Sequence, residues 1–273
     1  MKLVTLGTGS PLPDPNRAGP ATLVRTLSGD FLFDCGRGVL MRCAAVGTGP
    51  LTLHRVLITH LHSDHITDFN DILTMRWAMS PTEQPLRVVG PVGTARMVER
   101  TLHMLEDDIG YRMAHHDSLN WQPSCDVQET SEGIVFDDGV VTITSAPTDH
   151  APVSPTVGYR VESEGRSVVI AGDTVPCAGL NQLLVGADVY VQTVIRRALV
   201  KAVPAPRLQD ILNYHSGVED AAATAQQAGV STLVLTHLVP APWPGTEHEW
   251  ADEARAIFAG DVVVAEDLYE QDI

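Results

Sequence analysis

The chain has 273 residues, enough for one large domain or two small ones, and its 44% of apolar residues suits a globular protein with a sizeable core. Its 34 carboxylates against 18 lysines and arginines give a formal net charge of −16. This disfavours a nucleic-acid substrate, because phosphate backbones are bound by Lys and Arg, although a local basic patch would be compatible with an acidic total. No apolar run is long enough to cross a membrane, and the N-terminal apolar stretch is too short for a signal peptide, so we expect a cytoplasmic protein without a membrane partner.

Short runs rich in Val, Ile and Leu alternate with helical stretches along the whole chain. In chain order the pattern predicts strands at 2–6, 22–25 and 31–34, a helix at 38–46, a strand at 55–59, a helix at 66–79, a strand at 87–90, a helix at 92–109, strands at 140–146, 156–161 and 167–171, a helix at 178–185, a strand at 188–192, a helix at 218–229, a strand at 232–236, a helix at 248–259 and a strand at 261–265. This alternation predicts layered sheets with helices outside, an α/β fold that we expect to form one domain over 1–273.

Two segments lack a clear pattern. Residues 111–138 are the least regular, and we expect the wider segment 104–138 to form a lid or a pocket wall. Whether His115, His116 or Trp121 lines the pocket stays open. The acidic tail 267–273 is expected either to fray or to pack at an interface.

The strongest chemical signal is His60-Leu61-His62-Ser63-Asp64-His65, which directly follows the apolar run 56–59. At the end of a strand the backbone turns sharply, so neighbouring side chains can point to one centre. Imidazole suits zinc, and a carboxylate adds negative charge and tolerance of harder ions such as manganese or iron. This cluster therefore predicts a metal site.

Three further candidate ligands stand at the carboxyl ends of apolar runs, namely His150, Asp173 and His237. Functional groups often gather at this end of the strands in layered α/β folds. Taken singly, each residue would fit a turn or a cap equally well. Together with the first cluster they favour a site with more than one metal.

The order of these motifs resembles the metallo-β-lactamase superfamily, and within it the ribonuclease Z-like and arylsulfatase-like branch. The resemblance rests on Leu6-Gly7-Thr8-Gly9-Ser10-Pro11, Phe33-Asp34-Cys35-Gly36, the His60–His65 cluster, Asp149-His150, Gly172-Asp173-Thr174 and Thr236-His237. It implies an αββα sandwich of four layers, in which two mixed sheets are flanked by helices.

The resemblance also implies the roles of the ligands. The first metal would be held by His60, His62 and His150, the second by Asp64, His65 and His237, with Asp173 bridging both. Two divalent ions, expected to be zinc with manganese or iron as alternatives, would share a bridging hydroxide that attacks the substrate. Tyr214-His215-Ser216 resembles a motif whose histidine faces the metals, so the expected catalytic residues are Asp64 and His215.

The chain departs from the family at two places. Short ribonuclease Z enzymes carry a long basic arm between the third ligand motif and Gly-Asp-Thr, but here only the predicted hairpin 159–171 lies between His150 and Asp173. Where relatives continue with His-Glu-Ala, this chain has Gln192-Thr193-Val194, and glutamine cannot transfer a proton near pH 7.

We therefore expect a dinuclear metal-dependent hydrolase of a small-molecule ester, either a sulfate ester, a phosphodiester, or a lactone or carboxylate ester. The main alternative is a ribonuclease Z-like nuclease that processes tRNA 3′ ends. An iron-dependent oxidoreductase of the same fold and a scaffold without metals are less favoured. We also expect a homodimer, as relatives often form one.

Overall fold

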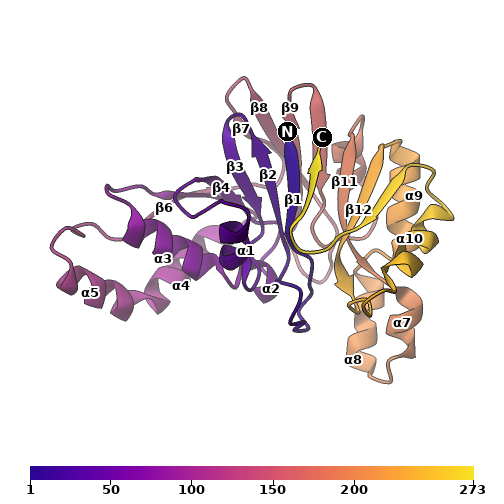
Figure 1. Ribbon diagram of the computed structural model, residues 1–273, viewed down its shortest axis with the longest axis horizontal. Coiled ribbons are helices and arrows are strands. Elements are labelled where there is room, and N and C mark those ends of the chain that lie inside the picture. The colour runs from indigo at the N-terminus through magenta and orange to yellow at the C-terminus, as the bar shows by residue number, and fades with distance from the viewer.

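The computed structural model describes residues 1–273 as two seven-stranded mixed sheets packed face to face (Figure 1). In spatial order the first sheet contains β14 (Tyr269–Asp272), β1 (Lys2–Gly7), β2 (Ala21–Thr26), β3 (Gly29–Phe33), β4 (Leu53–Leu57), β5 (Leu86–Gly90) and β6 (Cys125–Glu129). The second contains β13 (Asp261–Val264), β12 (Thr232–Val239), β11 (Val189–Ile195), β10 (Arg166–Ile170), β9 (Val157–Ser163), β8 (Val141–Pro147) and β7 (Gly133–Asp137).

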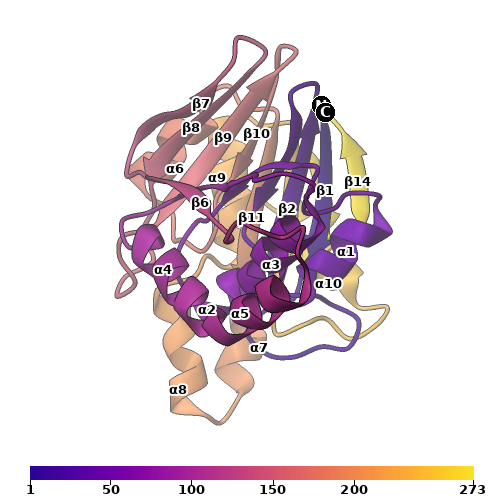
Figure 2. The same ribbon diagram turned by 90° about the vertical axis from the view of Figure 1, so that its left-hand side faces the viewer.

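Helices cover both outer faces (Figures 1 and 2). Those on the side of the first sheet are α1 (Val39–Ala45), α2 (Ser63–Ile66), α3 (Phe69–Met79), α4 (Thr94–Met104) and α5 (Glu106–His115). Those on the side of the second are α6 (Ala178–Leu184), α9 (Val218–Ala228) and α10 (Glu247–Arg255). The short segments α7 (Arg197–Ala202), α8 (Pro206–Gln209) and η1 (Asp210–Asn213) project from one end of the sandwich. The expected αββα fold is confirmed.

The central strands are continuous apolar runs because both of their faces are buried. In β10, Val168 and Ile170 point into the layer between the sheets, whereas Val169 packs under the helices of the second sheet. Both faces therefore require apolar side chains. The predicted hairpin between β9 and β10 is also present, with Ser163 paired to Arg166 and no room for an arm.

The strands that the sequence did not predict are all at sheet edges, where polar side chains face solvent. β6 and β7 arise from the segment expected to be irregular. β6 is the edge strand of the first sheet, and β7 is the edge strand of the second. The tail is neither frayed nor loose, because β14 pairs antiparallel with β1 and Glu270 accepts a hydrogen bond from Lys2 at 2.8 Å. The single helix expected at 92–109 is instead two helices, α4 and α5. None of the helices is both long and apolar enough to cross a membrane.

Close packing at one glycine gives a stability test. A Cβ added to Gly179 in α6 would lie 1.9 Å from the carbonyl oxygen of Pro147 in β8, whereas one added to Gly110 in α5 would meet nothing within 4 Å. We expect Gly179→Ala to lower the free energy of unfolding by about 1–3 kcal/mol through overpacking. Gly110→Ala should raise it by roughly 0.5–1 kcal/mol, since alanine favours the helix. Urea unfolding of both variants measures these changes, and equal effects would contradict the packing argument.

Candidate metal centre

All seven predicted ligands lie together at one edge of the sandwich. They come from the loop after β4, from α2, from the segments following β8 and β10, and from β12. The strands β8, β10 and β12 run in the same direction, so their carboxyl ends meet at this edge. Both sheets therefore contribute to the centre.

The ligand atoms form two groups. One contains His60, His62, His150 and Asp173, and the other contains Asp64, His65 and His237. Within each group, the ligand atoms all lie within 4.8 Å of one another. In the sets expected from the family resemblance, Asp173 is shared between the two groups; here its ligand atom falls within the first group.

Asp173 is central to both groups. Its Oδ2 lies 3.8 Å from the Nε2 atoms of His60 and His150. The same oxygen lies 3.5 Å from Nε2 of His65 and 3.6 Å from Nε2 of His237. One carboxylate oxygen thus contacts imidazoles of both groups, as a bridging ligand would.

Asp34 orients two of the ligands from outside the centre. Its carboxylate accepts hydrogen bonds from the backbone N–H and the hydroxyl of Thr59, each at 2.8 Å. Because the Thr59 hydroxyl donates to Asp34, its oxygen accepts from Nδ1–H of His60 at 3.0 Å. His65 likewise donates from Nδ1 to Asp34 at 2.7 Å. Both rings therefore direct Nε2 to the centre, where it can bind a metal once it carries no proton.

A backbone carbonyl orients a third histidine, His150. Nδ1 of His150 donates to the carbonyl oxygen of Tyr214 at 2.8 Å, which leaves its Nε2 unprotonated. The sequence does not show that Thr59 orients His60 or that the Tyr214 carbonyl orients His150, because hydroxyls and backbone oxygens occur in every loop. Only their position in the structure identifies them.

The centre fits divalent cations. Nδ1 of His62 lies 3.0 Å from Nε2 of His60 and 3.4 Å from Nε2 of His150, so three ring nitrogens converge where one proton can join only two of them. Nε2 of His65 and Oδ1 of Asp173 are buried without any hydrogen-bond partner. Buried polar atoms normally have a partner, and a metal ion supplies one for nitrogen and carboxylate ligands alike.

The protonation of the ligands differs between the two groups. Although burial alone would lower the pKa of His65, Asp173 and Asp34 raise it well above its usual value, so a metal would have to displace a proton from this ring. Burial lowers the pKa of His60 well below its usual value and also lowers that of His62, so both rings are neutral at pH 7. Burial alone would raise the pKa of Asp173, but His237 and His65 hold it well below its usual value. Neutral imidazoles and an ionised carboxylate are the forms that bind metal.

His215 lies beside the centre. It is 6% exposed, its Nδ1 lies 3.9 Å from Oδ2 of Asp173, and that nitrogen has no hydrogen-bond partner. Gln192 does not reach the ligands, since its amide donates to the carbonyl of Thr193 at 2.8 Å and its oxygen accepts from Tyr190.

The other aromatic candidates are separate from the centre. His115 and His116 are exposed at the end of α5, where their rings contact each other with centroids 4.6 Å apart. The carbonyl of Trp121 accepts a hydrogen bond from Trp77 at 2.7 Å, under the helices of the first sheet. None of these three residues joins the two groups of ligands.

Comparison with known proteins places this centre in a family. A family model described as a β-lactamase superfamily domain matches residues 30–238. Ribonuclease Z of Mycobacterium avium (strain 104) is 55% identical over 271 residues, which cover 98% of this chain and 97% of that protein. The chain belongs to the ribonuclease Z family of the metallo-β-lactamase superfamily. It is a metal-dependent hydrolase that acts on ester bonds.

Solved structures agree on the fold. The metallo-β-lactamase fold protein YhfI from Bacillus subtilis is similar with a TM-score of 0.76 at 20% identity, covering 99% of this chain and 98% of that one. Human tRNase Z, short form, is similar with a TM-score of 0.75 at 24% identity, covering 100% of this chain and 99% of that one.

These relatives contradict our expectation of a small-molecule ester substrate and of no nucleic-acid partner, and they give no support to an arylsulfatase-like activity. The expectation relied on the missing arm and on the net charge. The arm is absent, but the Mycobacterium avium ribonuclease Z aligns over 97% of its own length, so it has no long arm either. Net charge is a sum over the whole surface, whereas binding a phosphate needs only a few cations near the site.

The orientation of His65 by Asp34 gives a test. In Asp34→Asn the new amide would donate to Nδ1 of His65, which would move the proton to Nε2 and prevent that atom from binding metal. We expect zinc affinity to fall by about 10- to 100-fold, measured by competition with a chromogenic chelator. Asp71→Ala, on the exposed side of α3, is the control and should keep the wild-type affinity. Equal affinities of the two variants would show that Asp34 does not orient the ligand.

Proposed function

We propose that this protein is a dinuclear metal-dependent ribonuclease that processes the 3′ ends of tRNA precursors. The observation that carries the proposal is the 55% identity over nearly the whole chain to a protein named ribonuclease Z. The similarity to human tRNase Z supports the fold in which this chemistry would occur. The two groups of ligands supply the chemistry that hydrolysis of a phosphodiester requires.

We assign the ligands as the clusters suggest. His60, His62 and His150 would hold one metal, Asp64, His65 and His237 would hold the other, and Asp173 would bridge them. Zinc is the expected metal because five of the seven ligands are imidazoles, while the two carboxylates also accept manganese or iron. When bound, such a pair polarises a phosphoryl oxygen and lowers the pKa of water, which makes a nucleophile at neutral pH.

His215 would stabilise charge on the reacting phosphate. Burial lowers the pKa of His215 to about 4, so the ring is neutral at pH 7 and retains one N–H. A neutral ring with this pKa is a poor proton donor but a good hydrogen-bond donor to a developing negative charge. Asp64 would be the second catalytic residue, beside His215 at the reacting atoms. His237 holds the Asp64 carboxylate in place, since its Nε2 lies 3.2 Å from Oδ2 of Asp64.

Cations for the RNA backbone lie on the segment between β11 and His215. Lys201 and Arg207 are exposed on α7 and α8 and form no ion pair, while Arg196 is bound to Glu249 and Glu253. This segment starts at the carboxyl end of β11, the same edge as the metal centre (Figure 1). The chain therefore has free positive charge beside the centre despite its total of −16.

We further propose that residues 1–273 act as one domain and that 104–138 forms a wall near the substrate. A cytoplasmic location, where tRNA precursors are found, remains a prediction.

The activity itself is directly testable. The zinc-loaded protein should cleave a tRNA precursor with a 3′ extension, and it should not hydrolyse an aryl sulfate. His62→Ala should abolish cleavage, because it removes a ligand at which three ring nitrogens converge. Product ends are mapped on a sequencing gel. If the protein binds two metals but leaves the precursor intact, the proposed function is wrong.

The role of His215 requires separate evidence. His215→Ala should lower kcat on the precursor by about 10²–10³, the usual effect of losing one donor to a developing charge. The metal content, measured by atomic emission, should stay at two ions per chain. Loss of metal in this variant would instead make His215 a residue that supports the ligands.

A further inference from the structure

The metal centre faces solvent at His62. This residue is partly exposed, whereas the other six candidate ligands are buried. Leu61, directly before it, is also partly exposed, and Ser63, directly after it, is exposed. A substrate therefore reaches the centre past residues 61–63.

The helix α4 begins beside this opening. β4 and β5 are parallel neighbours, so the loops that follow them lie at the same edge of the sheet. The loop after β4 carries His60 and His62, and the loop after β5 leads into α4. A Cβ added to Gly93, the residue before α4, would lie 3.1 Å from Cδ1 of Leu61. The start of α4 therefore packs directly against the loop that carries the ligands.

The start of α4 is also fixed from the other side. Glu129, at the end of β6, accepts hydrogen bonds from the backbone N–H groups of Gly93 and Ala95 at 2.8 and 3.0 Å. The hydroxyl of Thr94 donates to the carbonyl of Pro91 at 2.7 Å. The side chains on the first turns of α4 thus have a defined position relative to the metal centre.

Two arginines lie on these turns. Arg96 and Arg100 are exposed and form no ion pair. Nη2 of Arg96 would lie 3.6 Å from a Cβ at Gly93, the same position that contacts Leu61, so this guanidinium is beside the opening. Arg100 follows one turn later on the same face, about 6 Å further along the helix axis. Guanidinium groups that are free of carboxylates suit phosphate, which they can bind with two hydrogen bonds.

The acids nearby do not neutralise these arginines. Glu129 is already used by the backbone at the start of the helix. Glu99, the single acid of α4, is exposed and forms an ion pair with neither arginine. His103, on the next turn, is paired with Glu106 at 3.3 Å. The free positive charge of α4 therefore lies at the end nearest the metal centre.

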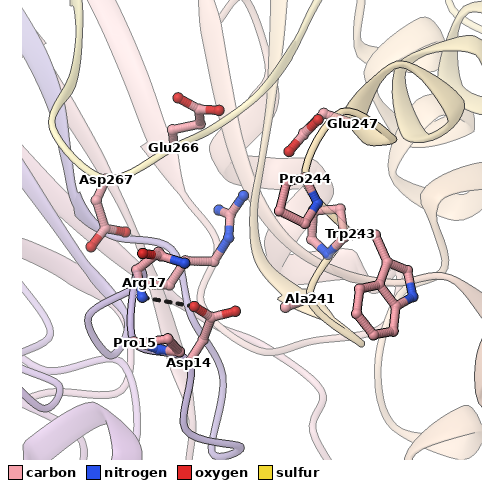
Figure 3. Close-up of a pocket in the computed structure, with 11 residues that line it drawn as sticks. Asp14, Pro15, Arg17, Ala241, Trp243, Pro244, Glu247, Glu266 and Asp267 are labelled. Atoms are coloured by element: carbon pink, nitrogen blue, oxygen red, sulfur yellow. Dashed lines mark hydrogen bonds between the residues drawn. The ribbon is translucent and has the colours of Figure 1, made fainter.

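The charge is reversed in a groove of about 560 Å³ between the loops 14–17 and 241–244 (Figure 3). Arg17 is the only cation of its lining, and Nη1 of Arg17 already donates to the Thr8 hydroxyl and the Ala265 carbonyl. The groove is lined by four carboxylates, those of Asp14, Glu247, Glu266 and Asp267. Like charges repel, so a phosphate backbone is disfavoured there and favoured along α4.

The arrangement of the helices gives the cations two sides. In both views of the fold, α2, which carries Asp64 and His65, lies between α4 on one side and α7 and α8 on the other (Figures 1 and 2). Lys201 and Arg207 are on α7 and α8. Free cations therefore flank the ligands from two directions.

We propose that Arg96 and Arg100 bind two phosphates of the RNA substrate, on the side of the cleaved bond opposite to Lys201 and Arg207, so that the strand leaves the metal centre along the exposed face of α4. The proposal rests on the proposed ribonuclease function and adds the residues that position the RNA on this side.

The first test measures KM and kcat on a tRNA precursor at several KCl concentrations. Arg96→Ala and Arg100→Ala should each raise KM by about fivefold, the effect of losing one exposed charge contact, and should leave kcat unchanged. The slope of log KM against log KCl should fall by about 0.7–0.9 for each arginine, because one phosphate contact less releases fewer counterions. Arg96→Lys keeps the charge and should keep most of the slope.

Arg87→Ala is the matched control. Arg87 is exposed near the start of β5, at the opposite edge from the metals, forms no ion pair and carries the same charge. This variant should have the KM and the salt slope of wild type. If the α4 variants also keep the wild-type KM, or if Arg87→Ala raises KM as much as they do, the proposal is overturned.

The second test locates the phosphates. In precursors with one neutral methylphosphonate linkage at each position in turn, the KM of wild type should rise at two positions on the same side of the cleaved bond. Arg96→Ala should show no additional rise at one of them and Arg100→Ala none at the other, since each pair of changes removes one contact. Equal additional rises at every position would contradict a direct contact.

A binding experiment separates this proposal from the proposed function. In the inactive His62→Ala background, fluorescence anisotropy should show that Arg96→Ala raises the Kd of the labelled precursor about fivefold. That result would support the α4 face even if wild type failed to cleave the precursor. Cleavage by wild type with an unchanged Kd would reject the α4 face alone. Weaker binding of an acidic peptide but not of the RNA would assign this face to a protein and overturn the proposal.

Discussion

The buried carboxylate of Asp173 is the group on which the metal centre depends. An isolated charge in this position would be strongly unfavourable, so it must be surrounded by compensating groups. Here the compensation comes from imidazoles of both sheets, with His60 and His65 on one side and His150 and His237 on the other. Because no single layer can supply this shell, the chemistry exists only when the two sheets are packed together. Metal binding therefore favours the assembled sandwich over any separated part of it.

The backbone at this edge is shaped to bring the ligands close. Gly172 precedes Asp173 with φ of 67°, and a Cβ there would lie 2.7 Å from Cβ of Thr59, the residue that orients His60. His237 itself has φ of 49°, a left-handed conformation that is uncommon for a residue with a side chain. Such conformations persist where the surrounding structure fixes them, and they are often found at functional sites. The close approach of these strand ends explains why a glycine stands directly before Asp173.

The acidic surface and an RNA substrate are compatible once charge is considered locally. The exposed cations Lys201 and Arg207 stand at the edge that carries the metals, and the bound metals would add positive charge at the reacting phosphate. These few phosphate contacts would take the place of the long basic arm that this chain lacks.

The sequence by itself determined the fold family, the buried strands and the seven candidate ligands that the structure brings together. These features are readable because apolar runs mark strands buried on both faces, and because clustered His and Asp at strand ends are rare without a metal. The edge strands β6, β7 and β14 were not readable, since an edge strand buries too little to need an apolar pattern. Only the tertiary structure revealed the parts played by Thr59 and the Tyr214 carbonyl, because these depend on which segments lie beside them. The substrate was misjudged from net charge, a whole-chain sum that carries no information about where the charges lie.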